Sequence, residues 1–138
     1  MSWNFKNSKN KFLMAALACS VLSSVGTASA QSKKLETVGI SVGSLGNPYF
    51  VSLVNGATKQ AQKINPQVKI LSVSSEYDLG KQSSQIDSFI SSGANIILLA
   101  AADPQAIGSA VNRARAAGIV VIAVDVSALN ADAAVQTD

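Results

Sequence analysis

Four short apolar runs recur along the chain, separated by stretches in which apolar residues return every three or four positions. The runs are 37–43 (TVGISVG), 68–74 (VKILSVS), 95–101 (NIILLAA) and 119–125 (IVVIAVD). As a set they are rich in valine and isoleucine, and the last two are almost unbroken. This pattern is typical of strands buried on both faces of a parallel sheet.

The stretches between the runs carry helix signals. The first helix is expected to start at Asn47–Pro48, an N-cap followed by proline, and to stop at Asn65–Pro66. A second is expected over about 81–92, before a glycine. A third is expected to begin at Asp103–Pro104 and to end at Gly118.

Alternation of strand and helix with short turns predicts right-handed crossovers and an α/β fold with an open, doubly wound parallel sheet. A fifth strand could begin over Ala134–Thr137. Tyr77 and Asp78, after the second run, are expected to be turn residues. No closing helix follows before Asp138, which is an unusual place for a complete domain to end.

The first thirty residues have the pattern of a secretory signal peptide. Lys6, Lys9 and Lys11 form a basic start, and the apolar stretch 12–25 is too short for a permanent membrane helix. Ala28–Ala30 provides a small-x-small cleavage site before the next residue. We therefore assign 1–30 to a cleavable signal peptide and expect an exported protein.

Removing this segment changes the charge and the cysteine content. The whole chain has eleven basic and eight acidic residues. Three basic residues leave with the signal, so eight of each sign remain, which gives no support for nucleic-acid binding. The only cysteine, Cys19, leaves as well, although a lipid-attachment role for Cys19 is an alternative. Leu17 is badly placed for a lipoprotein motif.

The residues for most catalytic chemistry are missing. The chain has no histidine, and no Gly-x-Gly-x-x-Gly follows a run. Gly80–Lys81 resembles the end of a phosphate loop, but the other required positions do not fit. Several carboxylates are present, and no spacing selects an acid–base pair among them. We predict that the protein is not an enzyme and uses no cofactor or metal.

Polar and aromatic residues follow three of the predicted strands, where open parallel sheets bind ligands. They are Asn47, Tyr49 and Phe50 after the first strand, Asp103 after the third and Asp125 at the end of the fourth. An aromatic face stacks on the C–H face of a sugar ring, while carboxylates and amides bond its hydroxyls. These residues are the candidate ligand site.

Three of these candidates also have a purely structural explanation: helix capping for Asn47 and Asp103, and core packing for Phe50. Tyr49 lies off the apolar stripe of its helix and is the better ring candidate. Asp125 ends a highly apolar strand, where an unpaired carboxylate would be costly, so it needs a partner. A ligand hydroxyl would be a suitable one.

The sequence resembles the N-terminal part of the periplasmic sugar-binding proteins of ABC transporters, of the ribose- and galactose-binding type. The segments that carry the resemblance are GSLGNPYFVSLVNGA, YDLGKQSSQIDSFISSGANIILLAAADPQAIGSAVNRARAAGIVVIAVD and the closing VQTD. The resemblance covers essentially all of residues 35–138, and it implies that 31–138 is the N-terminal lobe of a longer protein whose second lobe is absent. The resemblance implies one lobe of a two-lobed protein that closes on a sugar.

The resemblance also implies roles for individual residues. Sugar contacts would come from Asn47, Tyr49 and Phe50 after the first strand, from Asp125 after the fourth and from Asp138 near the last strand. Ribose-type members have an arginine directly after the Asp125 position, and here the residue is Val126. This difference favours another pentose, a hexose or a polyol over ribose.

By resemblance, the full-length protein would be a monomer that captures a sugar or polyol and presents it to an inner-membrane ABC permease. One alternative is a periplasmic ligand-sensing protein for a membrane receptor. A less favoured one is a sugar-responsive transcriptional regulator of the same fold, which would carry a DNA-binding segment in place of residues 1–30.

We predict export with cleavage after Ala30, because a basic start, an apolar stretch and a small-x-small site occur in order. Mass spectrometry of periplasmic extract should find a chain that begins at Gln31. An acylated N-terminus at Cys19, or an uncleaved cytoplasmic product, would contradict this assignment.

Overall fold

A computed structural model describes residues 34–136, which contain five strands and three helices. The elements in chain order are β1 (Thr37–Val42), α1 (Pro48–Ile64), β2 (Lys69–Ser74), α2 (Leu79–Ser91), β3 (Ile96–Leu99), α3 (Gly108–Ala116), β4 (Val120–Val124) and β5 (Ala133–Val135). None of the helices in 34–136 is long and apolar enough to cross a membrane.

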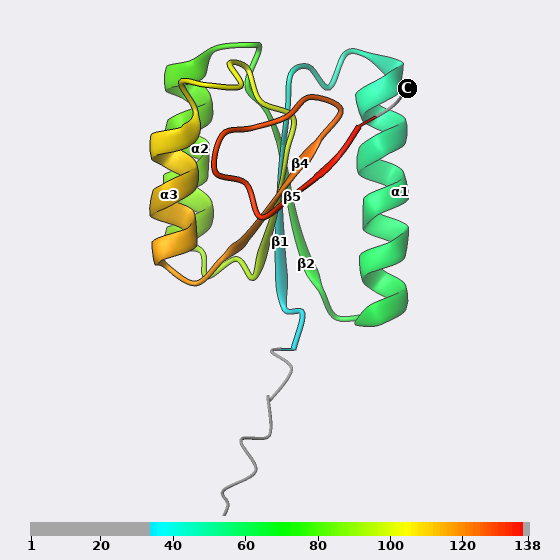
Figure 1. Ribbon diagram of the computed structural model, residues 1–138. Coiled ribbons are helices and arrows are strands. Elements are labelled where there is room, and N and C mark those ends of the chain that lie inside the picture. Colours follow the sequence, from blue (N-terminus) through cyan, green and yellow to red (C-terminus); the bar gives the residue numbers. More distant parts are fainter. Residues whose placement is uncertain (1–33, 137–138) are drawn as a thin grey trace, which may run out of the picture. The chain divides into compact units, whose positions relative to one another are not determined.

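The five strands form one parallel sheet in the order β2-β1-β3-β4-β5. In register, Val38 lies between Ile70 of β2 and Ile96 of β3. All carboxyl ends therefore meet at one edge, which is the upper edge in Figure 1. The predicted open, doubly wound α/β sheet is confirmed, and the fifth strand begins one residue earlier than expected.

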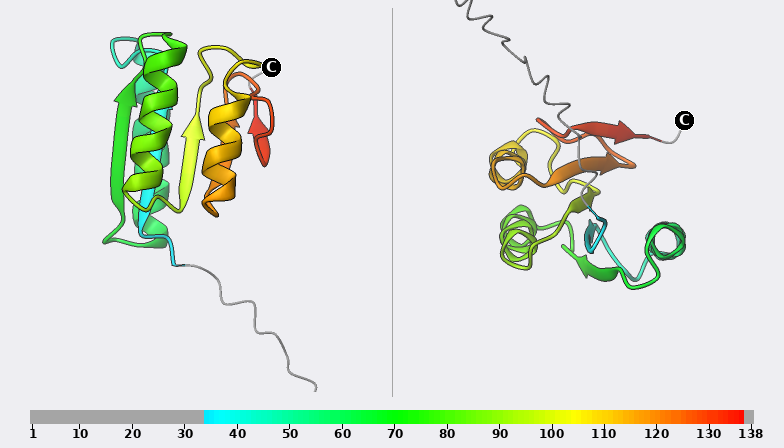
Figure 2. Two further views of the ribbon diagram at one scale, coloured as in Figure 1. Left: turned by 90° about the vertical axis from the view of Figure 1, so that its left-hand side faces the viewer. Right: turned by 90° about the horizontal axis from the view of Figure 1, so that it is seen from below.

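Helices cover the two faces of the sheet unequally. Figure 2 shows α1 on one face and α2 with α3 on the other. Val38, Ile40 and Val42 of β1 point to the α1 side and pack with Phe50. Side chains alternate along a strand, so the intervening residues of β1, such as Gly39, face α2 and α3. On that face α2 packs so closely that the Phe89 ring lies against Gly39.

The third helix starts later than the sequence suggests. Asp103–Pro104 was expected to open α3, whereas the α-helix begins at Gly108 and residues 104–107 form turns. The backbone of this segment is engaged elsewhere, because the Leu129 N–H donates to the Pro104 carbonyl at 2.7 Å. The loop after β4 is thereby held against these turns, and Asp103 caps the turns instead of the helix.

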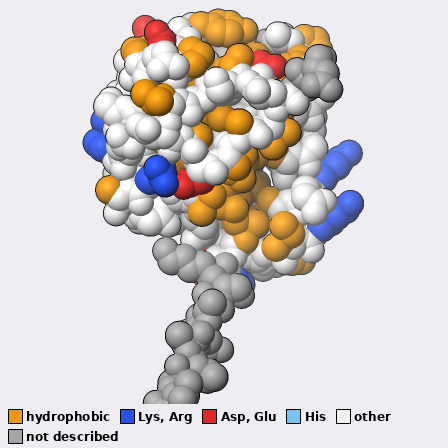
Figure 3. All heavy atoms as spheres, in the orientation of Figure 1, with side chains coloured by type: hydrophobic (Ala, Val, Ile, Leu, Met, Phe, Trp, Pro, Cys, Tyr) orange, Lys and Arg blue, Asp and Glu red, His pale blue; other side chains and the backbone are white. Residues whose placement is uncertain are grey.

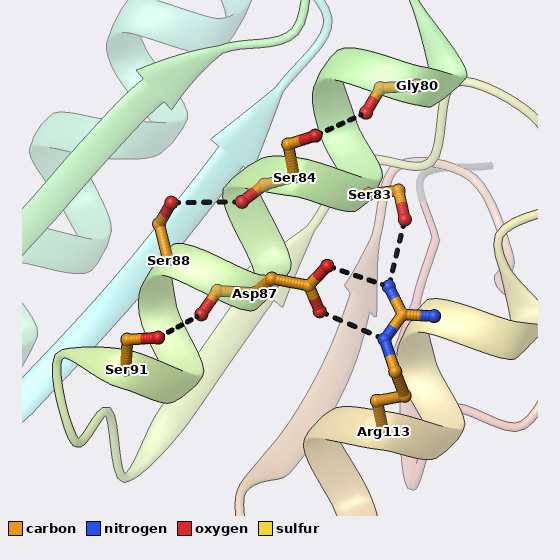
Figure 4. Close-up of polar contacts among 7 residues, drawn as sticks. All are labelled: Gly80, Ser83, Ser84, Asp87, Ser88, Ser91 and Arg113. Atoms are coloured by element: carbon orange, nitrogen blue, oxygen red, sulfur yellow. Dashed lines mark hydrogen bonds and ion pairs between the residues drawn. The ribbon is translucent and has the colours of Figure 1, made fainter.

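An ion pair joins α2 to α3, which lie on the same face of the sheet (Figure 4). Arg113 donates to both carboxylate oxygens of Asp87, at 2.9 and 3.0 Å, and to the Ser83 hydroxyl at 3.0 Å. Exposed pairs of this kind contribute little stability alone. The two-pronged geometry instead fixes how the two helices lie beside each other.

The α1 side of β3 and β4 carries an apolar groove of about 310 Å³ near the amino ends of these strands. Leu35, Ile64, Ile96 and Val120 line it, and Figure 3 shows apolar side chains gathered around a hollow on this side. The amide oxygen of Asn95 at the same place accepts from the backbone of residues 36 and 37. This groove is therefore apolar and far from the strand ends that were expected to bind ligand.

We predict that Gly39→Ala destabilises the protein, because the added Cβ would lie 2.7 Å from the buried Phe89 ring. Overpacking of this kind costs about 1 to 3 kcal/mol of unfolding free energy. Gly56→Ala is the matched control: nothing lies within 4 Å of its Cβ, and alanine in an exposed helix should stabilise by about 0.5 kcal/mol or more. Urea unfolding followed by circular dichroism measures both, and equal free energies would contradict the packing.

Candidate ligand-binding site

The loop between β1 and α1 is built around a helix cap. Asn47 has extended backbone, and its side-chain oxygen accepts a hydrogen bond from the Tyr49 N–H at 3.0 Å, while Pro48 occupies the first helical position. Capping therefore uses the oxygen of this exposed amide. The side-chain NH₂ of Asn47 is the group left to meet a ligand.

The two neighbouring aromatic rings do different things. Phe50 is 5% exposed and belongs to the core under α1, whereas Tyr49 is 40% exposed. Their ring centres lie 5.2 Å apart at 70°, so the Phe50 ring meets Tyr49 edge to face. Phe50 thus supports the exposed ring. A direct ligand contact by Phe50 stays a prediction, and little of its surface is exposed to make one.

Tyr49 reaches Asp125, which lies 76 positions further along the chain. Its hydroxyl donates to the Asp125 carboxylate at 3.1 Å. Asp125 directly follows β4 and has a left-handed backbone with φ of 67°, a conformation that Asp and Asn adopt more readily than other side chains. Its N–H donates to the Val135 carbonyl at 2.9 Å, which holds this conformation against β5.

This contact supplies the partner that Asp125 was expected to need. The second carboxylate oxygen makes no hydrogen bond to any residue in 34–136. The pair therefore presents an aromatic face, a phenol oxygen and a carboxylate oxygen on one partly exposed surface. The two oxygens can accept hydrogen bonds from hydroxyl groups of a ligand, and the aromatic face can stack on an apolar ring.

Asp103 lies after β3 at the same edge and is occupied by its own turn. One carboxylate oxygen accepts from the backbone N–H groups of Gln105 and Ala106, both at 2.9 Å. These hydrogen bonds, chiefly the one from Ala106, hold the pKa of Asp103 below its usual value. The capping explanation therefore accounts for Asp103, and its role as a ligand residue is only a prediction.

A buried glutamine beneath the edge was missed by sequence reasoning. Gln82 of α2 is fully buried, and its amide nitrogen donates to the Ser41 hydroxyl at 3.1 Å and to the Ala100 carbonyl at 2.9 Å. Its oxygen accepts from the Ala102 N–H at 2.8 Å. One side chain thus ties the carboxyl end of β1 to the turn after β3. The helical spacing could have indicated this burial, because Gln82 lies four and seven positions before the core residues Ile86 and Phe89.

A second amide extends this network to β2. Gln85 accepts from the Ser41 hydroxyl at 2.9 Å and donates to the Ser74 carbonyl at 2.8 Å. Ser75, also fully buried, donates its hydroxyl to the Val42 carbonyl at 3.1 Å. Side chains of α2 and of the turn before it therefore fix the positions of the carboxyl ends of β1, β2 and β3 relative to one another.

Two of the predicted features lie outside the described residues: the ligand residue Asp138, and the signal segment with Cys19. Within 34–136, no group of three or more carboxylate, histidine or cysteine side chains is close enough to hold a metal ion. The candidate site in the described part consists of Asn47, Tyr49 and Asp125, supported by Phe50 and Gln82.

Comparison with known proteins identifies the family of the chain. Residues 38–138 match the model of a periplasmic binding protein domain. The chain belongs to the periplasmic binding protein family. The resemblance seen in the sequence is thus confirmed.

Curated relatives include ribose import binding proteins. The protein of Bacillus subtilis (strain 168) is 40% identical over 96 residues, covering 70% of this chain and 31% of the relative. That of Escherichia coli (strain K12) is 34% identical over 113 residues, covering 82% and 36%. The chain spans about a third of the length of these relatives.

Some solved structures with the same fold contain small cyclic ligands. The Caulobacter myo-inositol binding protein bound to myo-inositol has a TM-score of 0.63 and 25% identity, covering 75% of this chain and 34% of that one. An ABC transporter solute binding protein from Clostridium phytofermentas with bound L-rhamnose has a TM-score of 0.59 and 32% identity, covering 67% and 29%. The family is therefore one of substrate-binding proteins of ABC transporters.

We predict that Gln82→Leu destabilises the protein by about 2 kcal/mol or more, because Ser41, Ala100 and Ala102 would lose buried hydrogen-bond partners. Gln62→Leu is the matched control on an exposed helical position and should change the unfolding free energy by less than about 0.5 kcal/mol. Chemical denaturation of both variants tests the network. A Gln82→Leu protein as stable as the parent would show that the amide contacts contribute nothing net.

Proposed function

We propose that residues 31–138 are the first ligand-binding lobe of a periplasmic protein that captures a monosaccharide or cyclic polyol and delivers it to an inner-membrane ABC permease. The observation that carries the proposal is the contact between Tyr49 and Asp125 at the carboxyl edge of the sheet. Residues 1–30 would be the export signal, and no reaction would be catalysed.

Tyr49 would provide the stacking surface. The residue is partly exposed, and its ring packs against the buried Phe50 ring in an edge-to-face arrangement. The apolar C–H face of a sugar or inositol ring fits an aromatic face of this kind. The hydroxyl of Tyr49 would at the same time keep Asp125 oriented toward the ligand.

Asp125 would provide the directional contacts. A carboxylate accepts only, so it pairs with the donor hydroxyls of a ring sugar through charge-assisted hydrogen bonds. The second lobe expected in the full-length protein would bury those hydrogen bonds and so strengthen them. The relatives named as ribose import proteins and the neighbours bound to inositol and rhamnose support this ligand class.

Val126 narrows the choice within the class. An apolar side chain next to Asp125 cannot donate to a ligand hydroxyl, as the arginine of ribose-type members would. Fewer fixed donors on this side favour a ligand whose recognition depends more on ring stacking. A hexose, a deoxyhexose or a cyclic polyol meets this condition better than ribose.

Titration of the isotope-labelled chain with D-glucose, L-rhamnose, D-ribose and myo-inositol, followed by NMR, tests the proposal. At least one of these should shift the amide signals of Asn47, Tyr49 and Asp125. The dissociation constant should be poorer than about 1 mM, or about −4 kcal/mol, because one lobe leaves the far face of the ligand in water. No shift with any ligand, or shifts confined to the apolar groove, would overturn the proposal.

Asp125→Asn should weaken this binding by about tenfold, the effect of losing a charge-assisted hydrogen bond. Asparagine is chosen because it tolerates the left-handed backbone at this position and still accepts from Tyr49. Asp87→Asn, on the exposed surface of α2, is the matched control and should leave the affinity unchanged. Equal loss in both variants would point to a general charge effect instead of a contact.

A further inference from the structure

The turn between β2 and α2 is strained in a way that a simple connection does not require. Glu76 and Tyr77 both have positive φ, of 53° and 59°. Asp78 closes the turn by donating its N–H to the Ser75 carbonyl at 3.0 Å. Two central residues with positive φ are the mark of turns that normally use Asn and Gly, and a bulky aromatic side chain there is an outlier.

The strain places one ring in a definite position. The Tyr77 ring lies directly against Gly43, the residue that follows β1, so that a Cβ on Gly43 would be 2.3 Å from the ring. Any side chain at position 43 would displace the ring. Glycine at this position is therefore what allows Tyr77 to lie over the carboxyl end of β1.

Tyr77 is a largely exposed residue. Tyr77 is 61% exposed, and its hydroxyl makes no hydrogen bond to any residue in the described range. Because the residue is mostly exposed, its contact with Gly43 adds little packing to offset the backbone strain. Strain of this kind tends to be kept at ligand sites, where a fixed side-chain position matters.

The sheet order relates this ring to the proposed site. Tyr77 lies over the end of β1, Asp125 follows β4, and β3 is between them. Neighbouring strands are about 4.8 Å apart, so roughly 10 Å separate the β1 and β4 ends. A six-membered ring with its hydroxyls fits within that span, above the ends of β1 and β3.

We propose that Tyr77 is a second aromatic contact for the ligand and that the Gly43–Tyr77 pair selects ring-shaped ligands over linear ones. This inference rests on the proposed function and deepens it. Tyr49 and Asp125 bound the ligand at the β4 side, and Tyr77 bounds it at the β1 side. A linear polyol has no flat C–H face and gains nothing from the second ring.

The chain has two tyrosines, so tyrosine-selective ring labelling gives one set of NMR signals for Tyr49 and one for Tyr77. Titration uses D-glucose and myo-inositol as ring ligands and glycerol as the linear probe. With whichever ring ligand shifts Tyr49, the Tyr77 signals should shift with the same dissociation constant. Glycerol should leave Tyr77 unshifted.

Tyr77→Asn separates the contact from folding, because asparagine suits a left-handed position. This variant should be at least as stable as the parent, yet bind the ring ligand about two- to tenfold more weakly, the range for one aromatic contact. Gly43→Ala, which displaces the ring, should weaken binding in the same way and leave the sheet folded.

The outcomes distinguish this inference from the function on which it rests. If Tyr49 shifts while Tyr77 does not, and Tyr77→Asn keeps the parent affinity, Tyr77 is a turn residue and the inference is wrong while the sugar site stands. If neither tyrosine responds to any ring ligand, the proposed function and this inference both fail. If Tyr77→Asn weakens glycerol and ring ligands equally, the ring does not select by shape.

Discussion

The parallel pairing of β1 with both β2 and β3 is the constraint on which the rest of this molecule depends. β1 lies between β2 and β3, and both neighbours run parallel to it. Every loop that leaves a strand end therefore starts from the same edge. The candidate site needs residues from loops that are far apart in sequence, and only this arrangement brings them to one surface. The buried amides of Gln82 and Gln85 then fix the heights of the strand ends.

The strands and their order of appearance could be predicted from the sequence because buried parallel strands have few alternatives. The run 95–101 is too short and too apolar for a surface helix, and it becomes β3 at the centre of the sheet. The start of α3 could not be predicted in the same way. The Asp103–Pro104 signal fits a helix cap and a capped turn equally well, and the choice is made by a loop that docks from residues 128–131.

The sequence predicts that the site lies at the carboxyl edge of the sheet, but it does not predict which side chains contact one another there. Topology alone places Tyr49 and Asp125 at the carboxyl ends of their strands. Their hydrogen bond needs a left-handed Asp125 and an exposed ring turned toward β4, and neither follows from a pattern of apolar residues. Tyr77 shows the same limit, because its position depends on the missing side chain of Gly43. Non-local contacts and backbone outliers are what sequence reasoning lacks here.

The separation of Tyr49 and Asp125 by 76 positions has a consequence for the order of folding. In the folded sheet β3 pairs with both β1 and β4, so this hydrogen bond depends on long-range pairing of the strands that precede the two residues. Contacts of such large sequence separation form late, because a long loop must be closed first. A partly folded chain would thus have helices and some sheet but no ligand site. A ligand of the proposed site would in this way bind completed molecules, and its binding would hold the last strand ends of the sheet together.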